Sequence, residues 1–174
     1  MKNMNLLYTG KTDLVLSQSN IHEIIDIAKK EITPTADAKN IKTSFELPSS
    51  QIPLRCDKIK LGLVFVNLLS NAIKFTPSGG EIKLKVLDKK DNVLISIQDN
   101  GRGIPPEKLD KIFEDFYQVE NHLIRESGGL GVGLSIARKI VELHGGKIWA
   151  ESEGVNLGSV FYIRLPLSLP SQSD

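Results

Sequence analysis

The sequence predicts an α+β domain in two layers, with a mixed and mainly antiparallel sheet covered on one face by three main helices. Segments with helical periodicity alternate with runs of β character along the chain, and one helix is apolar around nearly its whole circumference. The chain has 174 residues, 40% of them hydrophobic and 25% charged. That length suffices for one well-buried core and is short for two independent domains.

The first helix is predicted to begin at Ile21, where apolar residues start to recur at helical spacing, and Pro34 predicts a kink or an end. The preceding residues have mixed polarity and no clear period. We interpret residues 1–18 as the end of an upstream element plus a linker, residues 19–167 as the folded domain, and residues 168–174 as a flexible tail. The segment "IKTSFEL" after the helix is predicted to be a strand.

The second helix is predicted from an N-cap at Asp57 to about Lys74, before a Pro- and Gly-containing turn at residues 76–80. Its polar residues Asn67, Asn71 and Lys74 lie at i, i+4 and i+7 and form one stripe. A buried amide without a hydrogen bond costs about 1–3 kcal/mol. The stripe must therefore face either neighbouring backbone or a ligand, and amide oxygens with an ammonium suit Mg²⁺ and phosphate.

Two strands are predicted next, as a hairpin. The second of them, "NVLISIQD", places Asp99 on the same face as three apolar residues. A carboxylate on an inward face requires hydrogen bonds. Asp99 either closes an Asp-Asn-Gly turn on itself or accepts a hydrogen bond from the exocyclic amine of a base, with Gly101 and Gly103 giving positive φ angles and room for a ligand.

A polar, glycine-rich segment precedes the third helix, "LSIARKIVELH", which Gly145 and Gly146 are predicted to end. We interpret this segment, with residues 119–129 at its centre, as a mobile loop, either a simple hinge or an anion site at a helix N-terminus. It matches neither a Rossmann fingerprint nor a P-loop. Two further strands, "KIWAES" and "SVFYIRLP", complete the sheet.

The composition excludes several classes of function. With 22 basic and 21 acidic residues, the net charge of +1 gives no global basic field for nucleic acid. The single cysteine excludes an internal disulfide and a cysteine-based zinc site, and it favours a cytoplasmic location. No apolar run reaches the length of a membrane helix, so we expect no direct membrane contact, although the parent protein could be membrane-anchored.

The histidines are weak catalytic candidates. His22 is interpreted as a surface residue of the first helix, and His122 lies in the glycine-rich loop segment. His144 is interpreted as a residue at the end of the third helix that interacts with the helix dipole.

The order of these motifs resembles the catalytic ATP-binding domain of sensor histidine kinases. The family's N, G1, F and G2 boxes correspond to "NLLSNAIKFT", "DNGRGIP", "FEDFYQ" and "GGLGVGL", and the resemblance covers about residues 19–167. It places the chain in the superfamily that also includes DNA gyrase, heat-shock chaperone ATPases and mismatch-repair ATPases. The fold that it implies is the Bergerat ATP-binding fold. The resemblance also makes residues 1–18 the remnant of an upstream dimerisation helix and linker.

The resemblance implies ATP and Mg²⁺ as cofactors. It makes Asn67, Asn71 and Lys74 the catalytic residues, with Asn71 as the Mg²⁺ ligand and Lys74 as a phosphate contact. The residues that it assigns to ATP binding are Asn71, Lys74, Asp99, Gly101, Gly103, Ile104, Phe116, Arg125, Gly129, Leu130, Gly131, Val132, Gly133 and Leu134. Two positions depart from the family pattern, since Leu130 stands where threonine is usual and Asp115 stands where proline is common.

The expected function is transfer of the γ-phosphoryl group of ATP to a histidine on a separate dimerisation domain of the parent protein, for relay to a response regulator. The chain carries no recognisable phosphoacceptor segment, so we expect the isolated domain to be a monomer. One alternative is an ATPase or serine kinase of the same superfamily. A second alternative is a degenerate nucleotide-binding or interaction module.

Overall fold

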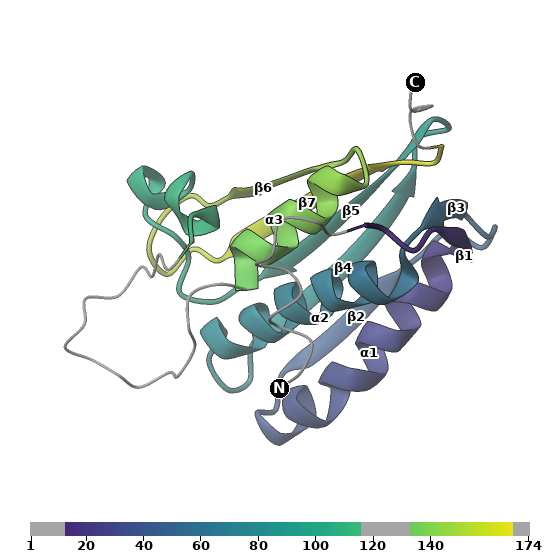
Figure 1. The fold of residues 1–174 in the computed structure, drawn as a ribbon. Coiled ribbons are helices and arrows are strands. Elements are labelled where there is room, and N and C mark those ends of the chain that lie inside the picture. Colours follow the sequence, from purple (N-terminus) through teal and green to yellow (C-terminus); the bar gives the residue numbers. More distant parts are fainter. Residues whose placement is uncertain (1–12, 116–132, 169–174) are drawn as a thin grey trace.

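The computed structural model describes residues 13–115 and 133–168 (Figure 1). Its three helices are α1 (Ile21–Ala38), α2 (Lys58–Phe75) and α3 (Gly133–Leu143). The strands are β1 (Ser17–Asn20), β2 (Lys42–Glu46), β3 (Pro53–Cys56), β4 (Glu81–Asp88), β5 (Asn92–Asp99), β6 (Lys147–Glu151) and β7 (Ser159–Pro166), and two short 3-10 turns are η1 (Pro106–Lys108) and η2 (Lys111–Phe113). The predicted glycine-rich loop lies mostly in residues 116–132, outside the described residues.

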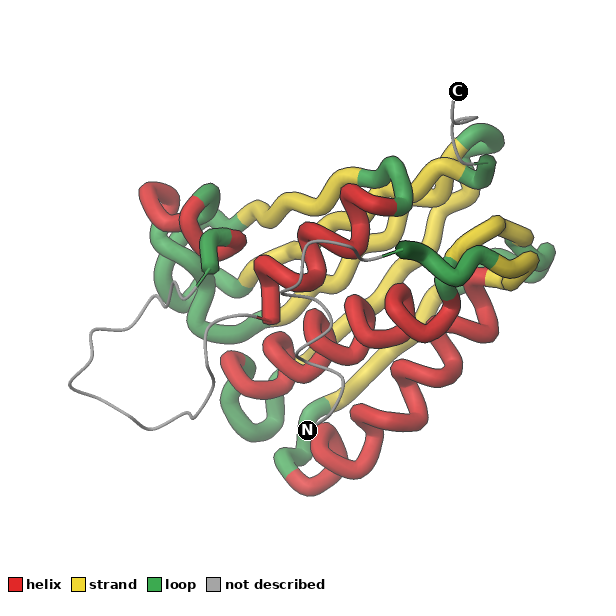
Figure 2. The backbone as a smooth tube through the Cα atoms, in the orientation of Figure 1, coloured by secondary structure: helices red, strands yellow, loops and turns green. Residues whose placement is uncertain are grey.

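The main sheet has five strands in the order β2-β4-β5-β7-β6. Strands β2 and β4 pair in parallel and the other neighbours are antiparallel, so the sheet is mixed and mainly antiparallel as predicted. The three helices lie together on one face of this sheet (Figure 2). The predicted two-layer α+β architecture is therefore confirmed.

A second sheet of two strands was not predicted. Strand β1 pairs antiparallel with β3, with Ser17 opposite Cys56 and Asn20 opposite Pro53. Residues 17 and 18 thus belong to a strand rather than to the linker to which the sequence assigned them. Both strands have four residues, too few for a periodic pattern to be visible in the sequence.

Helix α1 continues through Pro34 and ends at Ala38, so Pro34 does not end it. The helix starts at an Asn20 cap, whose side chain accepts a hydrogen bond from the backbone N–H of His22 at 3.0 Å. Ile32 and Ala36, on either side of the proline, are almost completely buried. Their burial in the core offsets the backbone hydrogen bond that proline cannot donate.

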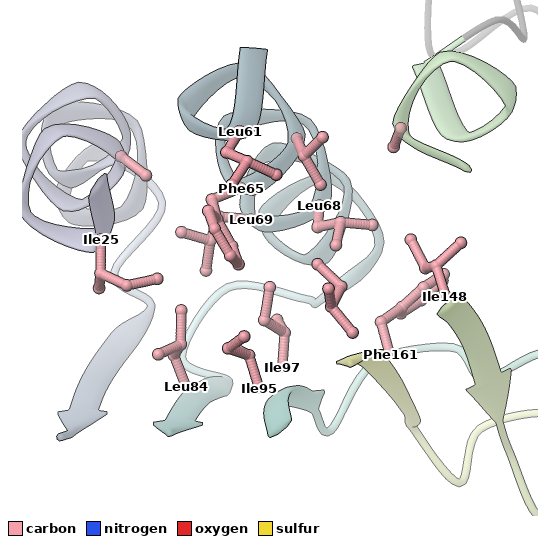
Figure 3. Close-up of a cluster of buried hydrophobic side chains, with 14 of the residues drawn as sticks. Ile25, Leu61, Phe65, Leu68, Leu69, Leu84, Ile95, Ile97, Ile148 and Phe161 are labelled. Atoms are coloured by element: carbon pink, nitrogen blue, oxygen red, sulfur yellow. The ribbon is translucent and has the colours of Figure 1, made fainter. Parts of the chain in front are cut away.

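The core lies between the helices and the sheet (Figure 3). Figure 3 shows Phe65 and Leu69 of α2 above Leu84 of β4 and Ile97 of β5, and all four side chains are at most 1% exposed. Val93, Ile95, Ile97 and Asp99 are buried while the residues between them are more exposed, which confirms the predicted face of β5. Each fully buried Leu, Ile or Phe contributes about 1.5–3 kcal/mol of transfer free energy.

Asp57 caps the N-terminus of α2, as predicted, and also connects it to two other parts of the fold. Its carboxylate accepts hydrogen bonds from the backbone N–H of Lys60 and of Val15, both at 3.0 Å. Burial raises the pKa of Asp57, but these bonds and the nearby Lys60 ammonium outweigh it and hold the pKa below its usual value. Its own backbone N–H donates to Nε2 of His144 at 3.0 Å.

His144 lies directly after the end of α3, as predicted, and is buried, with 3% of its surface exposed. Since Nε2 accepts from the N–H of Asp57, Nδ1 carries the proton and donates to the carbonyl of Ile140 at 2.7 Å. Burial is the main cause of a lowered pKa at His144. Neutral His144 therefore joins the end of α3 to the start of α2.

The end of α3 follows the prediction. Gly145 has a φ of 69°, and the N–H of Gly146 donates to the carbonyl of Val141 at 2.9 Å. Within residues 13–115 and 133–168, no helix is long and apolar enough to span a bilayer.

Candidate nucleotide-binding site

The polar stripe of α2 lies where α2 meets α3. Asn67, Asn71 and Lys74 are all half-buried, and the Asn67 amide Nδ2 contacts the carbonyl of Gly133 at 3.4 Å. No residue of the described chain forms a hydrogen bond with the Asn71 side chain. The sequence left two alternatives for these amides, hydrogen bonds to neighbouring backbone or contacts with a ligand. The first is seen only as the long contact of Asn67. The amide of Asn71 remains for a ligand.

The first turn of α3 faces this stripe. A Cβ added at Gly133 would lie 3.7 Å from the amide oxygen of Asn67, which is ordinary van der Waals contact. The first N–H groups of a helix have no partner within the helix and carry the positive end of its dipole. Gly133 and Leu134, both half-buried, therefore bring a helix N-terminus next to Asn67.

Asp99 is buried at the end of β5, with 6% of its surface exposed. Oδ1 accepts the N–H of Gly101 at 2.8 Å, which is the turn contact that the sequence offered as an alternative. Oδ2 accepts the hydroxyl of Ser159 at 2.5 Å. A carboxylate has about four lone-pair positions, so these two bonds fix its orientation and leave acceptor capacity for a base amine.

Ser159 is a site residue that the sequence did not identify. It begins β7 and pairs in register with Asp99. Only the pairing of β5 with β7, two segments 60 residues apart, brings the hydroxyl to the carboxylate. A serine after a glycine at the start of a strand is too common to indicate this role.

Gly103 has a φ of 66°, as predicted, whereas Gly101 does not have a positive φ. In the direction of a Cβ, both glycines are packed against other parts of the chain. A Cβ at Gly101 would lie 2.4 Å from the carbonyl oxygen of Phe75, and one at Gly103 would lie 2.0 Å from that of Gly154. These glycines let the turn after β5 pack against α2 and against the β6–β7 connection.

Two buried apolar residues, Ile104 and Phe113, follow this turn in the chain. Ile104 is 8% exposed, and its N–H donates to the Ser152 hydroxyl at 3.0 Å. Phe113 packs edge-on against Phe161, with ring centroids 6.2 Å apart. The other predicted binding residues, Phe116, Arg125, Gly129, Leu130, Gly131 and Val132, lie outside the described residues.

Phe75, the last residue of α2, was not predicted as a site residue. Its ring is partly exposed, and the Lys74 ammonium and the Arg102 guanidinium lie 5.1 Å and 5.3 Å from its centroid. The backbone N–H of Arg102 donates to the Phe75 carbonyl at 3.1 Å. The turn after β5 and the end of α2 thus form one unit that carries an aromatic ring and two cations.

In the part of the chain that the structure describes, no three His, Cys, Asp or Glu side chains come together as a metal site. The oxygen donors on the α2 stripe are neutral amides. Such donors hold Mg²⁺ only together with a ligand that brings its own negative charge, as a nucleotide triphosphate does.

Known proteins share both the sequence and the fold. The model of the family of histidine kinase-, DNA gyrase B-, and HSP90-like ATPases matches residues 56–169. The alginate biosynthesis sensor protein KinB of Pseudomonas aeruginosa is 34% identical over 165 residues, which cover 95% of this chain and 27% of that protein. The adaptive-response sensory kinase SasA of Prochlorococcus marinus is 42% identical over 130 residues, which cover 74% of this chain and 35% of that protein.

Among solved structures, the catalytic domain of histidine kinase ThkA matches with a TM-score of 0.77 and 32% identity, over 88% of this chain and 98% of that chain. ThkA in complex with the response regulator protein TrrA matches with a TM-score of 0.78 and 31% identity, over 94% of this chain and 45% of that chain. The chain spans about a quarter to a third of the length of the two curated relatives. It belongs to the family of histidine kinase-, DNA gyrase B-, and HSP90-like ATPases, as a catalytic ATP-binding domain of the sensor histidine kinase type.

Proposed function

We propose that this chain binds Mg-ATP and supplies the catalytic part of a sensor histidine kinase, which transfers the γ-phosphoryl group to a histidine on a separate dimerisation domain for relay to a response regulator. The observation that carries the proposal is the convergence of the Asn67–Asn71–Lys74 stripe with the N-terminus of α3. It combines neutral oxygen donors, a cation and a helix N-terminus, which together suit a metal-bound triphosphate.

The residues present fit a magnesium ion. Asn71 offers an amide oxygen with no hydrogen-bond partner among the described residues, at the centre of the stripe. One helical turn away, Lys74 carries the positive charge that a phosphate requires. Bound Mg²⁺ would neutralise charge on the phosphates, while Asn71 would fix the position of the metal on α2.

Asp99 supports binding of adenine. Its carboxylate is held by Gly101 and Ser159 and keeps acceptor capacity, so it can accept from the exocyclic amine of adenine. The carbonyl that guanine presents at the same place would face this negative charge. ATP and ADP are therefore the expected nucleotides, and GTP is excluded by repulsion.

Asn67 favours phosphoryl transfer to an imidazole over hydrolysis. The chain resembles superfamily ATPases in this helix, but those ATPases place a glutamate where Asn67 stands. That glutamate acts as a general base on water, whereas a neutral amide cannot accept a proton from water at physiological pH. An imidazole needs no such base, since its neutral form already offers a lone pair. A bond then forms between that nitrogen and the γ-phosphorus while the bond to ADP breaks, and the chain contributes positioning and charge neutralisation.

The partners belong to the parent protein and its pathway. A histidine-bearing dimerisation domain supplies the acceptor, and a receiver domain accepts the phosphoryl group in turn, as the complex of ThkA with a response regulator protein suggests by similarity. The chain itself is a cytoplasmic monomer in this proposal, whether or not the parent is anchored to a membrane.

The test is incubation with γ-labelled ATP and Mg²⁺, with and without a separate dimerisation domain that contains a phosphoacceptor histidine. Acid-labile label confined to the added domain supports the proposal. Rapid phosphate release by the chain alone favours an ATPase, and acid-stable label on serine favours a serine kinase. Absence of Mg-ATP binding favours a degenerate module.

A further inference from the structure

The C-terminal end of α2 is held by donors that come from other parts of the chain. The last four carbonyls of a helix have no N–H partner among the helical residues, and in α2 they belong to residues 72–75. The first of them accepts the N–H of the cap residue Thr76 at 3.0 Å. The last, that of Phe75, accepts the N–H of Arg102 at 3.1 Å. The two carbonyls between them need donors from elsewhere.

Lys39 supplies those donors. Its ammonium donates to the carbonyls of Ile73 and Lys74 at 2.7 Å and 2.9 Å, although 34 and 35 positions separate the residues in the sequence. Lys39 directly follows α1, and α1 and α2 lie side by side with their C-terminal ends on the same side of the domain (Figure 1). One side chain at the end of α1 therefore caps the end of α2.

This cap is charged, and its backbone is fixed. The backbone N–H of Lys39 donates to the carbonyls of Thr35 and Ala36, both at 3.2 Å, so Lys39 is tied to the last turn of α1. A hydrogen bond from an ammonium is stronger than one between neutral groups, and a cation at a helix C-terminus also interacts favourably with the helix dipole. Both effects hold the last turn of α2 in one position relative to α1.

The turn that Lys39 holds carries one side chain of the candidate nucleotide site. Lys74 takes part in the cap through its carbonyl, and in the proposed function its ammonium contacts a phosphate. Asn67 lies about two turns earlier, where α2 meets Gly133. A shift of the last turn would therefore move the Lys74 ammonium relative to the rest of the site, and a displacement of about 1 Å is enough to weaken a positioned contact strongly.

A cavity of about 410 Å³ adjoins the cap, and both Lys39 and Lys74 line it. Lys39 is also partly exposed. Water or a small ammonium ion can therefore reach the two carbonyls when the side chain is shortened. We expect a variant without the Lys39 ammonium to keep its fold and to lose the fixed position of the last turn of α2.

We propose that Lys39 is a positioning residue for the nucleotide site, which acts through Lys74 and does not itself touch the phosphates. The proposal rests on the proposed function, because it assigns a role within the same site. Lys39 lies outside the four motifs that carry the family resemblance, and only a contact between distant segments points to it. The alternative is a direct contact between Lys39 and a phosphate, and the experiment separates the two.

The test is calorimetric titration of Mg-ATP into wild type, Lys39→Met, Lys74→Met and the double variant, each checked for folding by circular dichroism. Lys39→Met keeps a long side chain but removes the donors. It should weaken Mg-ATP binding about tenfold, the factor expected when one charged hydrogen bond is lost. The double variant should bind as Lys74→Met does, because Lys39 acts through Lys74. Additive losses would indicate a direct contact and overturn the positioning role.

Restoring the charge should restore the affinity. Lys39→Arg should recover most of the Mg-ATP binding, and so should n-propylammonium chloride added to Lys39→Ala, whereas sodium chloride at the same concentration should not. The matched control is Lys30→Met, which removes an exposed ammonium from α1, roughly 14 Å away along the helix at about 1.5 Å per residue. It should bind Mg-ATP as wild type does.

Adenosine separates positioning from a general loss of structure. It has no phosphates, so it should bind wild type and Lys39→Met equally in NMR titrations of the ¹⁵N-labelled chain. A parallel loss of adenosine binding, a Lys39→Met variant that binds Mg-ATP as tightly as wild type, or failure of both arginine and n-propylammonium to restore binding would overturn the positioning role. A wild type that binds no Mg-ATP would instead contradict the proposed function, and the positioning role with it.

Discussion

Replacing His144 by leucine removes the side-chain contact between the end of α3 and the start of α2. Leucine fills a similar volume at a position that is 3% exposed, so the main loss is the acceptor for the backbone N–H of Asp57. The Ile140 carbonyl keeps the backbone bond from residue 144 at 3.2 Å. One buried donor is thus orphaned, and the free energy of unfolding should fall by about 1–3 kcal/mol at pH 7.5.

The pH dependence of the same variant tests the protonation state. Burial lowers the folded-state pKa of His144 below its usual value of 6.5, although the Ile140 carbonyl and the Asp57 charge oppose this shift and Lys60 adds to it. The unfolded state then binds more protons below about pH 6.5, so stability should fall as the pH falls from that value toward the folded-state pKa. The leucine variant should lack this part of the slope.

The assay is urea unfolding followed by circular dichroism between pH 5 and pH 8, on wild type and His144→Leu. Arg138→Leu is a control on α3, because its ion pair with Glu142 is exposed and should change stability by at most about 0.5 kcal/mol. A leucine variant as stable as wild type, with the same pH slope, would refute the hydrogen-bond assignment.

Three other variants test separate features of the site. Asp99→Asn should weaken ATP binding, and wild type should not bind GTP; displacement of bound ATP by GTP as effectively as by ADP would remove the base-reading role of Asp99. Ser159→Ala should weaken ATP binding less than Asp99→Asn. The alanine variant removes the hydrogen bond to one oxygen of the Asp99 carboxylate but leaves the hydrogen bond from the Gly101 N–H to the other. Equal losses of affinity would mean that Ser159 itself is indispensable. Thr76→Val should leave stability unchanged or raise it by up to about 1 kcal/mol, because the buried Thr76 hydroxyl has no partner within the described residues; a clear loss in thermal melts would contradict this.

The fold could be predicted from the sequence because most elements have a strong local period. Helix α2 is apolar on most of its circumference, and strand β5 alternates from Val93 to Asp99. Asp57 is a common capping residue in the position where a cap is needed. These features depend on residues close together in the chain.

The features that the sequence did not show depend on contacts between distant segments. Ser159 reaches Asp99, and Asp57 reaches His144, across 60 and 87 residues. Strands β1 and β3 are too short to show alternation. Pro34 does not end α1, because burial of Ile32 and Ala36 outweighs the local preference of proline.

The stripe of α2 was predicted as three residues on one face, and the structure adds its neighbour, the first turn of α3. Periodicity indicates which side chains of a helix share a face, but it does not indicate what that face meets. The open question was whether the amides bond backbone or a ligand. The structure answers it for Asn67 with one long contact and leaves Asn71 without a protein partner in the described chain.

The most direct measurement is calorimetric titration of ATP into wild type and Asn71→Ala, each with Mg²⁺ and with EDTA. Wild type should bind ATP more tightly with Mg²⁺ than without it. Asn71→Ala should fold normally, since Asn71 is half-buried and makes no hydrogen bond to the described residues, and should lose the Mg²⁺-dependent part of the affinity. A folded Asn71→Ala variant that binds Mg-ATP as tightly as wild type, or a wild type that does not bind it at all, would contradict the proposed site.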